Sequence, residues 1–561
     1  MSLTSRALGR LLKFPDATTH RVAVEQLQIP MPDGVNLVAD RWYPQRDGAE
    51  AAPVLLTRTP YGRKLEGMAG RLLAERGFQY VIVSCRGTFG SGGRWEPFWS
   101  EKSDGKAVFA WLAEQPWFPE TVATLGASYT GFTQWSVAAD LPPYVKAMSL
   151  GVTSSNFRDF VYPGGVFALA DMLAWTRGLE TQQLPRRKRR AARRGGKKAL
   201  ARAAATIPPT EADVSLLGRH VSYFQDWLTH DGRDDSLWMP IDFGPDVAAV
   251  APANMHAGWY DVFLTGQLRD FQAAKAAGRS ARLTVGPWVH SSVGNFATYL
   301  RETIHWMTAH LTEARVEPLA EVRVFVMGAR RWIDLADWPP PAEVTTYHLQ
   351  PDCALSATPA PASPPDTYRY DPHDPTPSVG GALLLPRSAG PKDNRKLEQR
   401  ADVLTYTTSP LAEDVTVVGT VNATLHVRSS LGHTDFFVRL CDVAPNGRSI
   451  NVCDGLQRVR PGSARQQADG TLRLELELSP IANTFVAGHR IRVQVSSGAH
   501  PRYARNTGSG EPHATARTLV VADQEIFHDA DHPSAISLPM LHDAVSPPPR
   551  GRTWRILRSR R

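Results

Sequence analysis

The chain has 561 residues, with 42% hydrophobic and 9% aromatic side chains and a formal net charge of +8. This composition is typical of a globular protein with a large core, and the length predicts roughly two to four domains. No stretch approaches 18 uninterrupted apolar residues, and residues 1–14 lack the apolar run of a signal peptide, so we expect no membrane span and no membrane partner. The four cysteines include no C-x-x-C pair, which favours reduced thiols in a cytoplasmic protein over a disulfide framework or a zinc site.

The positive charge is concentrated in two segments. Residues 186–198 hold nine Lys or Arg and no acid, and residues 550–561 form a second basic cluster in the tail. Neither segment has the interleaved aromatic residues or the surrounding motif of a nucleic-acid-binding fold. We therefore expect a solvated helix face or a mobile loop at 186–198, and no nucleic-acid partner.

The first part of the chain alternates strand and helix patterns. Residues 21–44 contain two strand-like runs around Pro32-Asp33-Gly34, which predict a hairpin. Apolar runs predict strands over 53–59, 79–84, 122–125 and 146–152. Between them, helical patterns are expected over 71–76 and 103–114. This alternation predicts a parallel α/β sheet.

The alternation stops after residue 152 and resumes near residue 246. Residues 153–245 contain aromatic, helical and very basic segments, and we interpret them as a helical cap inserted over the sheet. The sheet then continues, and its elements are expected at 253–259, 262–277, 281–285, 298–311 and 322–327. Residues 1–152 and 246–341 are thus predicted to form one α/β domain, completed by the last of these strands.

The pattern changes again after residue 341. Residues 352–398 are rich in Pro, Ser, Asp and Gly, and period-two strands follow. Leu472, Leu474 and Leu476 alternate with Arg473 and Glu475, as expected for strands that bury one face. Further runs of this kind cover 421–428 and 490–495. Several such strands without intervening helices predict a β-sandwich over 342–561.

A serine lies at the strand–turn–helix junction around residue 128. The strand pattern 122–125 leads into small residues, then Ser128, then a helical pattern. This is the arrangement of the nucleophile elbow of an α/β-hydrolase, although the usual G-x-S-x-G has Thr130 in its last position and Gly131 one residue later. A serine in an ordinary strand–helix turn is the alternative.

A serine nucleophile needs a histidine to accept its proton and a carboxylate to orient that histidine. In α/β-hydrolases these follow in the order Ser, Asp or Glu, His, each after a strand. Asp261 and His290 follow the two strands expected after the cap and so occupy the predicted positions. The alternatives are Asp270, within a helical pattern, and His256, within a strand.

Five motifs in a fixed order carry a resemblance to a known family. They are Pro60-Tyr61, Arg86-Gly87, the G-x-S-Y-x-G-x-T-Q-W pattern of 126–135, Ala257-Gly-Trp-Tyr-Asp261 and Gly286-Pro-Trp-x-His290. The match continues through Thr434-Asp435-Phe436, Asp442-Val443, Asp454-Gly455 and Arg492. In these motifs the chain resembles the cocaine esterase and X-prolyl dipeptidyl-peptidase (CocE/NonD) family of serine hydrolases, over nearly its whole length.

The resemblance implies an α/β-hydrolase sheet, a helical cap and a C-terminal jelly-roll. It also implies that Ser128, Asp261 and His290 form a catalytic triad. The family's oxyanion hole, a tyrosine hydroxyl and the backbone N–H after the serine, corresponds here to Tyr61 and Tyr129. Tyr61 also follows a predicted strand, where such a donor belongs, and a packed aromatic residue is its alternative.

The resemblance also bears on the acyl pocket. Trp175 and Phe263 lie at positions similar to the aromatic pocket residues of relatives that act on aromatic acyl esters, and a place in the core is the alternative for both. Relatives that act on α-amino acid esters have acids two and three residues after the triad aspartate, where this chain has Phe263 and Leu264. A site for a substrate ammonium group is therefore not expected.

Together these features predict a serine hydrolase that cleaves carboxylic esters with apolar or aromatic acyl groups. X-Pro dipeptidyl-peptidase or amidase activity is the variant, and a non-catalytic binding protein on the same scaffold is the second hypothesis. The chain has no H-E-x-x-H motif and no Cys/His cluster, and His528 and His532 stand isolated, so we expect neither metal nor cofactor. The expected partner is a small-molecule ester or amide substrate. The sequence does not indicate the oligomeric state.

Overall fold

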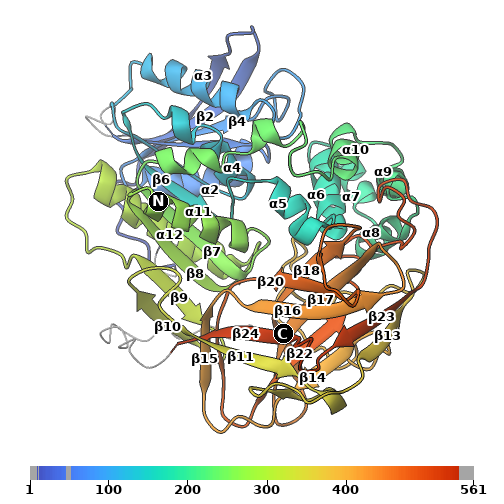
Figure 1. The fold of residues 1–561 in the computed structure, drawn as a ribbon. Helices are drawn as coiled ribbons and strands as arrows, with labels where there is room; N and C mark the ends of the chain where they lie inside the picture. Colours follow the sequence, from blue (N-terminus) through green and yellow to red (C-terminus); the bar gives the residue numbers. More distant parts are fainter. Residues whose placement is uncertain (1–8, 10–11, 46–51, 542–561) are drawn as a thin grey trace.

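A ten-stranded mixed sheet forms the centre of the N-terminal half in a computed structural model that describes residues 9, 12–45 and 52–541 (Figure 1). Its strands, in sheet order, are β1 (Val22–Pro30), β2 (Asn36–Pro44), β4 (Gln79–Ser84), β3 (Val54–Thr59), β5 (Val122–Ala127), β6 (Val145–Gly151), β7 (Ala253–Tyr260), β8 (Ala281–Val289), β9 (Val322–Val326) and β10 (Arg331–Leu335). The strands from β4 through β9 pair in parallel, whereas β1, β2 and β10 pair antiparallel. The predicted parallel sheet and its leading hairpin are confirmed.

Both faces of this sheet are covered by helices, which explains why its central parallel strands, such as β3 and β4, are buried along their whole length. Leu55 and Tyr80 pack on one face with α2 (Arg63–Ala74) and α12 (Val293–Leu311). Leu56 and Val81, one residue further along the same strands, pack on the other face with α3 (Glu101–Ala113). This part also contains α4 (Tyr129–Trp135) and α11 (Leu264–Ala276).

Several predicted boundaries in this part were wrong: α12 begins at Val293, not at residue 298, and β8 runs to Val289, not to residue 285. Helix α2 begins at Arg63, whereas the sequence predicted a start at residue 71. Gly67 and Gly70 weaken the helical pattern, but the structure needs them because Trp42 packs against both: a Cβ added at Gly70 would lie 2.8 Å from the Trp42 ring. The sheet also does not end with β9. The chain turns through Gly328 (φ +68°) and returns as β10, an antiparallel edge strand that the sequence reading missed.

The segment between β6 and β7 is helical, as expected of a cap. Its helices are α5 (Arg158–Val161), α6 (Leu169–Gln182), α7 (Arg186–Ala192), α8 (Gly196–Ala205), α9 (Ala212–Leu217) and α10 (Ser222–Thr229). Figure 1 shows them beside the sheet and next to the C-terminal strands. The basic run 186–198 forms α7 and the start of α8, and none of the α7 side chains is buried. The other basic cluster, 550–561, lies outside the described residues.

The C-terminal half is a sandwich of two antiparallel sheets. One contains β11 (Glu343–Leu349), β12 (Leu355–Ser356), β13 (Asp366–Tyr370), β15 (Val415–Gly419), β16 (Asn422–Ser429), β19 (Arg465–Gln466), β20 (Leu472–Glu477), β21 (Ile481–Phe485), β23 (Ala522–Phe527) and β24 (Ala535–Met540). The other contains β14 (Leu404–Thr407), β17 (Thr434–Val443), β18 (Ser449–Val459) and β22 (Arg490–Ser496). Leu425 and Leu474 from the first sheet share one core with Val438 and Val493 from the second.

The cap is fixed to the sandwich by backbone contacts. The N–H of Ala170 donates to the carbonyl of Pro501 at 3.0 Å, and the N–H of Ala504 donates to the carbonyl of Phe167 at 2.8 Å. Gly164, with φ +59°, packs so closely on β18 that an added Cβ would lie 1.7 Å from the Leu456 carbonyl oxygen. Cap and sandwich therefore meet along backbone surfaces that tolerate no side chain at this point.

We predict that Gly164→Ala destabilises the protein. The added methyl group collides with the Leu456 carbonyl, and overpacking of this kind costs about 1–3 kcal/mol. Gly178→Ala in α6 is the control, because an added Cβ there meets no atom of the described residues within 4 Å and alanine stabilises a helix interior by up to about 1 kcal/mol. The free energies of unfolding in urea measure both. Equal stability of the two variants would contradict the close contact between cap and sandwich.

Candidate active site

The candidate nucleophile occupies a strained backbone position. Ser128 links β5 to α4 with φ 59° and ψ −126°, a conformation that is rare for a residue other than glycine and common at functional turns. The flanking glycines permit the turn: a Cβ at Gly126 would lie 2.4 Å from the Thr130 carbonyl oxygen, and one at Gly131 would lie 2.5 Å from Thr153. Gly131, which stands one residue later than the last glycine of the usual motif, is thus required by its close packing against Thr153.

The three residues predicted for the triad come together. His290 Nε2 lies 3.0 Å from Ser128 Oγ, and His290 Nδ1 lies 2.7 Å from Asp261 Oδ2. Because a carboxylate only accepts, Nδ1 carries the proton and Nε2 is left to accept from the serine hydroxyl. The other oxygen of Asp261 accepts the N–H of Phe263 at 2.8 Å, which fixes the orientation of this buried carboxylate.

The two alternative residues have other partners. Asp270 lies in α11, where its carboxylate accepts the N–H of Ser155 at 2.8 Å and its hydroxyl at 2.6 Å. His256 lies within β7, and its ring stacks on Trp288 with 4.8 Å between centroids. Asp270 is thus held by Ser155, while His256 is buried beside Glu302, with 3.7 Å between His256 Nδ1 and Glu302 Oε2.

The electrostatic environment of His290 suits a general base. Burial alone lowers its pKa, but the charge of Asp261, the hydrogen bond to it and the charge of Asp171 outweigh burial, so the pKa is raised above 6.5. Below that raised pKa the imidazole is protonated and cannot accept the Ser128 proton. Any reaction that uses this pair should therefore become faster as the pH rises through the pKa of His290.

Tyr61 directs its hydroxyl at the serine. It follows β3, and the indole N–H of Trp175 donates to its oxygen at 3.1 Å. Burial raises the pKa of Tyr61 to about 12, an effect only partly offset by hydrogen bonds with Trp175 and Ser128. The phenol therefore stays protonated at neutral pH, and its proton is available to an oxygen atom beside Ser128.

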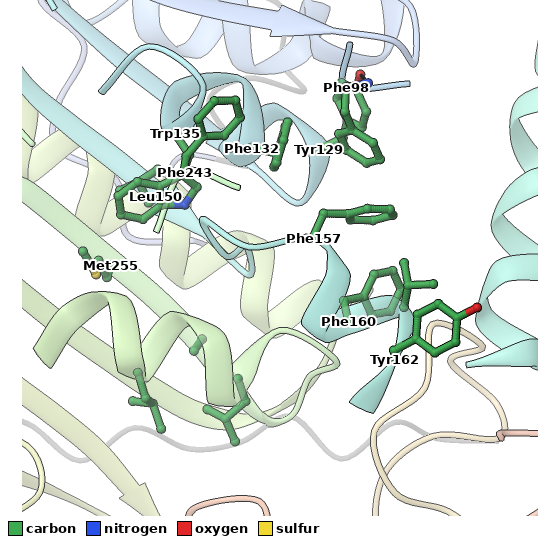
Figure 2. Packing of buried hydrophobic residues seen from close by; sticks show 14 of the residues in the cluster. Phe98, Tyr129, Phe132, Trp135, Leu150, Phe157, Phe160, Tyr162, Phe243 and Met255 are labelled. Carbon is green, nitrogen blue, oxygen red and sulfur yellow. Dashed lines mark hydrogen bonds between the residues drawn. The ribbon is translucent and has the colours of Figure 1, made fainter. Parts of the chain in front are cut away.

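Tyr129 contributes its backbone rather than its side chain. As the first residue of α4, it has an N–H without an acceptor inside the helix. Its phenol is held on the opposite side, where it donates to Glu101 at 2.9 Å and accepts the N–H of Phe98 at 2.8 Å. Figure 2 shows the Tyr129 ring beside Phe98, and the two rings stack at 4.8 Å.

A cavity of about 390 Å³ opens onto Ser128 and His290, and its walls are mainly aromatic. The aromatic wall consists of Tyr61, Phe98, Tyr129, Phe132, Phe157, Phe160, Trp175 and Phe263. Figure 2 shows Phe98, Phe132 of α4, and Phe157 and Phe160 at the start of α5, whose rings contact one another in series. Trp175 and Phe263 both lie at the cavity, and the Phe263 ring is 5.7 Å from the His290 ring.

One wall of this cavity was not predicted from the sequence. Leu384 and Leu385 line it, although they belong to the Pro- and Gly-rich segment between β13 and β14. The N–H of Leu384 donates to the carboxylate of Asp171 in α6 at 2.8 Å. Phe98, Phe157 and Phe160 were also missed. Their placement depends on tertiary packing, and the sequence pattern around them contains no local signal for it.

Among the described residues, no group of three or more His, Cys, Asp or Glu side chains is arranged to hold a metal ion. His528 pairs with Asp366, and His532 pairs with Asp529 and Asp469. In the described part of the chain, every helix is too short or too polar to cross a membrane.

Two family models and a characterised relative match this chain. Residues 33–292 match the model of the X-Pro dipeptidyl-peptidase (S15 family), and residues 314–537 match that of the X-Pro dipeptidyl-peptidase C-terminal non-catalytic domain. The cocaine esterase of Rhodococcus sp. (strain MB1 Bresler) is 35% identical, in an alignment that covers 92% of this chain and 98% of that protein.

Solved structures show the same fold. An aminopeptidase from the marine sediment archaeon Thaumarchaeota archaeon aligns with a TM-score of 0.81 at 22% identity, and an α-amino acid ester hydrolase with a TM-score of 0.77 at 22% identity. Each alignment covers 94% of this chain and 98% of the other. The fold and the sequence matches define a serine hydrolase of the α/β-hydrolase class. The chain belongs to the cocaine esterase and X-Pro dipeptidyl-peptidase (CocE/NonD) family.

Proposed function

We propose that this protein hydrolyses carboxylic esters through an acyl-enzyme on Ser128 and prefers apolar, especially aromatic, acyl groups. The observation that carries the proposal is the hydrogen-bonded chain from Asp261 through His290 to Ser128, which ends at an aromatic cavity. The 35% identical relative is named as a cocaine esterase, which supports ester cleavage. The intact chain of hydrogen bonds favours an enzyme over a non-catalytic binding protein on this scaffold.

Each residue has a defined role in the proposed reaction. Ser128 Oγ attacks the ester carbonyl while His290 Nε2 accepts its proton, and Asp261 stabilises the resulting imidazolium. The O–H of Tyr61 and the N–H of Tyr129 donate to the oxyanion. His290 then protonates the leaving alcohol. A water molecule, activated by the same imidazole, attacks the acyl-enzyme and releases the acid.

Amide substrates, including X-Pro dipeptides, are the second candidate, because the matching family model describes such a peptidase. A dipeptidyl-peptidase must bind a free ammonium group, and a carboxylate within the acyl pocket is the usual partner for it. The positions that would carry such acids are Phe263 and Leu264. Asp171 lies nearby but lines the adjacent polar cavity, and burial raises its pKa to about 7. These features favour esters.

We also infer the domain division and the setting of the enzyme. We assign 1–152 and 246–341 to the hydrolase domain, 153–245 to the cap and 342–561 to a β-sandwich of the jelly-roll type. The change from sheet to helices after β6, and back at β7, supports these limits. All four cysteines are free thiols, which supports a reducing, cytoplasmic setting. A small-molecule ester is the proposed partner.

The proposed activity predicts that p-nitrophenyl benzoate is turned over by the protein and not by Ser128→Ala. An Ala-Pro p-nitroanilide should be cleaved far more slowly than the ester, because the cavity lacks acidic side chains at residues 263 and 264. Initial rates for both substrates provide the test, with circular dichroism to verify folding of the variant. Faster cleavage of the dipeptide anilide would replace the ester assignment with a peptidase.

Tyr61→Phe should lower kcat for the same ester roughly 100-fold or more, because loss of one oxyanion donor typically has this effect. The KM should change little, since the phenyl ring that packs in the cavity remains. Tyr299→Phe, which also removes a buried hydroxyl beside β5, is the matched control and should keep most of the kcat. Unchanged kcat in Tyr61→Phe would remove Tyr61 from the oxyanion hole.

Phe263→Ala should raise the KM for benzoyl esters roughly tenfold or more and affect acetyl esters much less, because a buried aromatic contact contributes about 1.5–3 kcal/mol. Phe296→Ala is the control, since Phe296 is exposed on α12 and does not line the cavity. Michaelis constants for the two acyl groups decide the matter. An equal rise for both would show that Phe263 does not contact the acyl group.

A further inference from the structure

Three parts of the molecule converge beside His290. Residues 381–390, here called the wall loop, are closed at their base by reciprocal hydrogen bonds between Gly381 and Gly390 at 3.0 and 2.8 Å. Leu383 and Ala389 of this loop pack with Ala170 of α6 and with Val289, the residue before His290. The wall loop is thus clamped between the cap and the end of β8, and it presents Leu384 and Leu385 to the active-site cavity.

Asp171 lies at the centre of this junction. It follows Ala170 in α6, it is 3% exposed, and its carboxylate accepts the N–H of Leu384 at 2.8 Å. Asparagine or serine would serve a single backbone N–H with a smaller desolvation cost than a buried carboxylate. The hydrogen bond therefore does not by itself explain why an ionisable group is placed here.

The charged groups around Asp171 give a reason for an ionisable side chain at this position. They are Arg502 from the sandwich, already paired with Asp454 at 2.7 Å, and the two residues Asp261 and His290. Asp171 shares a second cavity, of about 550 Å³, with Asp261 and Arg502. Burial raises the pKa of Asp171 to about 7, and its negative charge in turn raises the pKa of His290.

We propose that Asp171 is a positioning residue of this active site with two separable effects. Its hydrogen bond to Leu384 holds the wall loop against α6, so that Leu384 and Leu385 complete the acyl pocket. In its ionised form, Asp171 stabilises the imidazolium form of His290, beside the contribution of Asp261. The inference rests on the proposed ester hydrolysis and deepens it, because it assigns part of the acyl specificity to a contact between cap and sandwich.

Two substitutions separate the effects. Asp171→Asn keeps an acceptor for the Leu384 N–H and removes the charge, so it should leave the KM for benzoyl esters unchanged. Loss of the charge lowers the pKa of His290, so the rising acidic limb of kcat/KM should move to lower pH. The plateau kcat should fall roughly 3- to 30-fold, the range for one charge acting at an effective dielectric constant of about 20. Asp171→Ala should show the same pH shift and, in addition, a higher KM for benzoyl than for acetyl esters.

Asp270→Asn is the matched control. Asp270 is equally buried, and burial raises its pKa to about 7 as well, but its partners are the N–H and O–H of Ser155. It should leave the acidic limb in place even if it lowers thermal stability. An unmoved limb in Asp171→Asn, or an equal shift in Asp270→Asn, would overturn the electrostatic role. An unchanged ratio of benzoyl to acetyl KM in Asp171→Ala would overturn the role in the pocket.

Labelling of Ser128 by a fluorophosphonate distinguishes failure of this inference from failure of the proposed function. The probe reports the Ser128–His290 pair without requiring that the ester be a substrate. If the wild type is labelled but turns over no ester, the proposed function fails, while the pH dependence of labelling in Asp171→Asn still tests the electrostatic role. A shift to lower pH supports that role, and identical profiles contradict it.

Discussion

The hydrogen bond between Ser128 and His290 depends on three parallel strands that end at the same edge of one sheet. Strands β5, β7 and β8 carry Ser128, Asp261 and His290 at or just beyond their carboxyl ends, where ligands bind in open α/β sheets. Ser128 contacts the imidazole from a backbone conformation with positive φ. Glycines at 126 and 131 make that conformation possible by letting strand, turn and helix pack without side chains between them. The rest of the molecule surrounds this point.

The sheet supplies the reactive groups, and the other two parts of the chain supply most of the pocket. Trp175 of the cap donates to the oxygen of Tyr61, so the proposed oxyanion donor of the sheet is oriented by the cap. Leu384 and Leu385 enter from the segment that connects strands of the sandwich. A change in how cap and sandwich meet would therefore alter acyl specificity while leaving the hydrogen bonds from Asp261 to Ser128 intact.

The sequence predicted those features that are determined locally or by a fixed order along the chain. Buried parallel strands appear as apolar runs, and the order of serine, acid and base after successive strands identified Ser128, Asp261 and His290 before their distances were known. Contacts between residues distant in the chain could not be predicted from the sequence pattern. The start of α2 was misplaced because its glycines accommodate Trp42, and Leu384 was overlooked because it lies in a Pro- and Gly-rich segment. Asp171 was overlooked because its contacts, such as that with Leu384, are made with groups distant in sequence.

Direct detection of the acyl-enzyme tests the central claim most directly. The protein is mixed with excess p-nitrophenyl benzoate, quenched in acid within the first turnover, digested and analysed by mass spectrometry. The account predicts that a benzoyl group is attached to the peptide that contains Ser128, and that the modification disappears in Ser128→Ala. A benzoyl group on another residue, or rapid turnover with the Ser128 peptide unmodified throughout the time course, would contradict it.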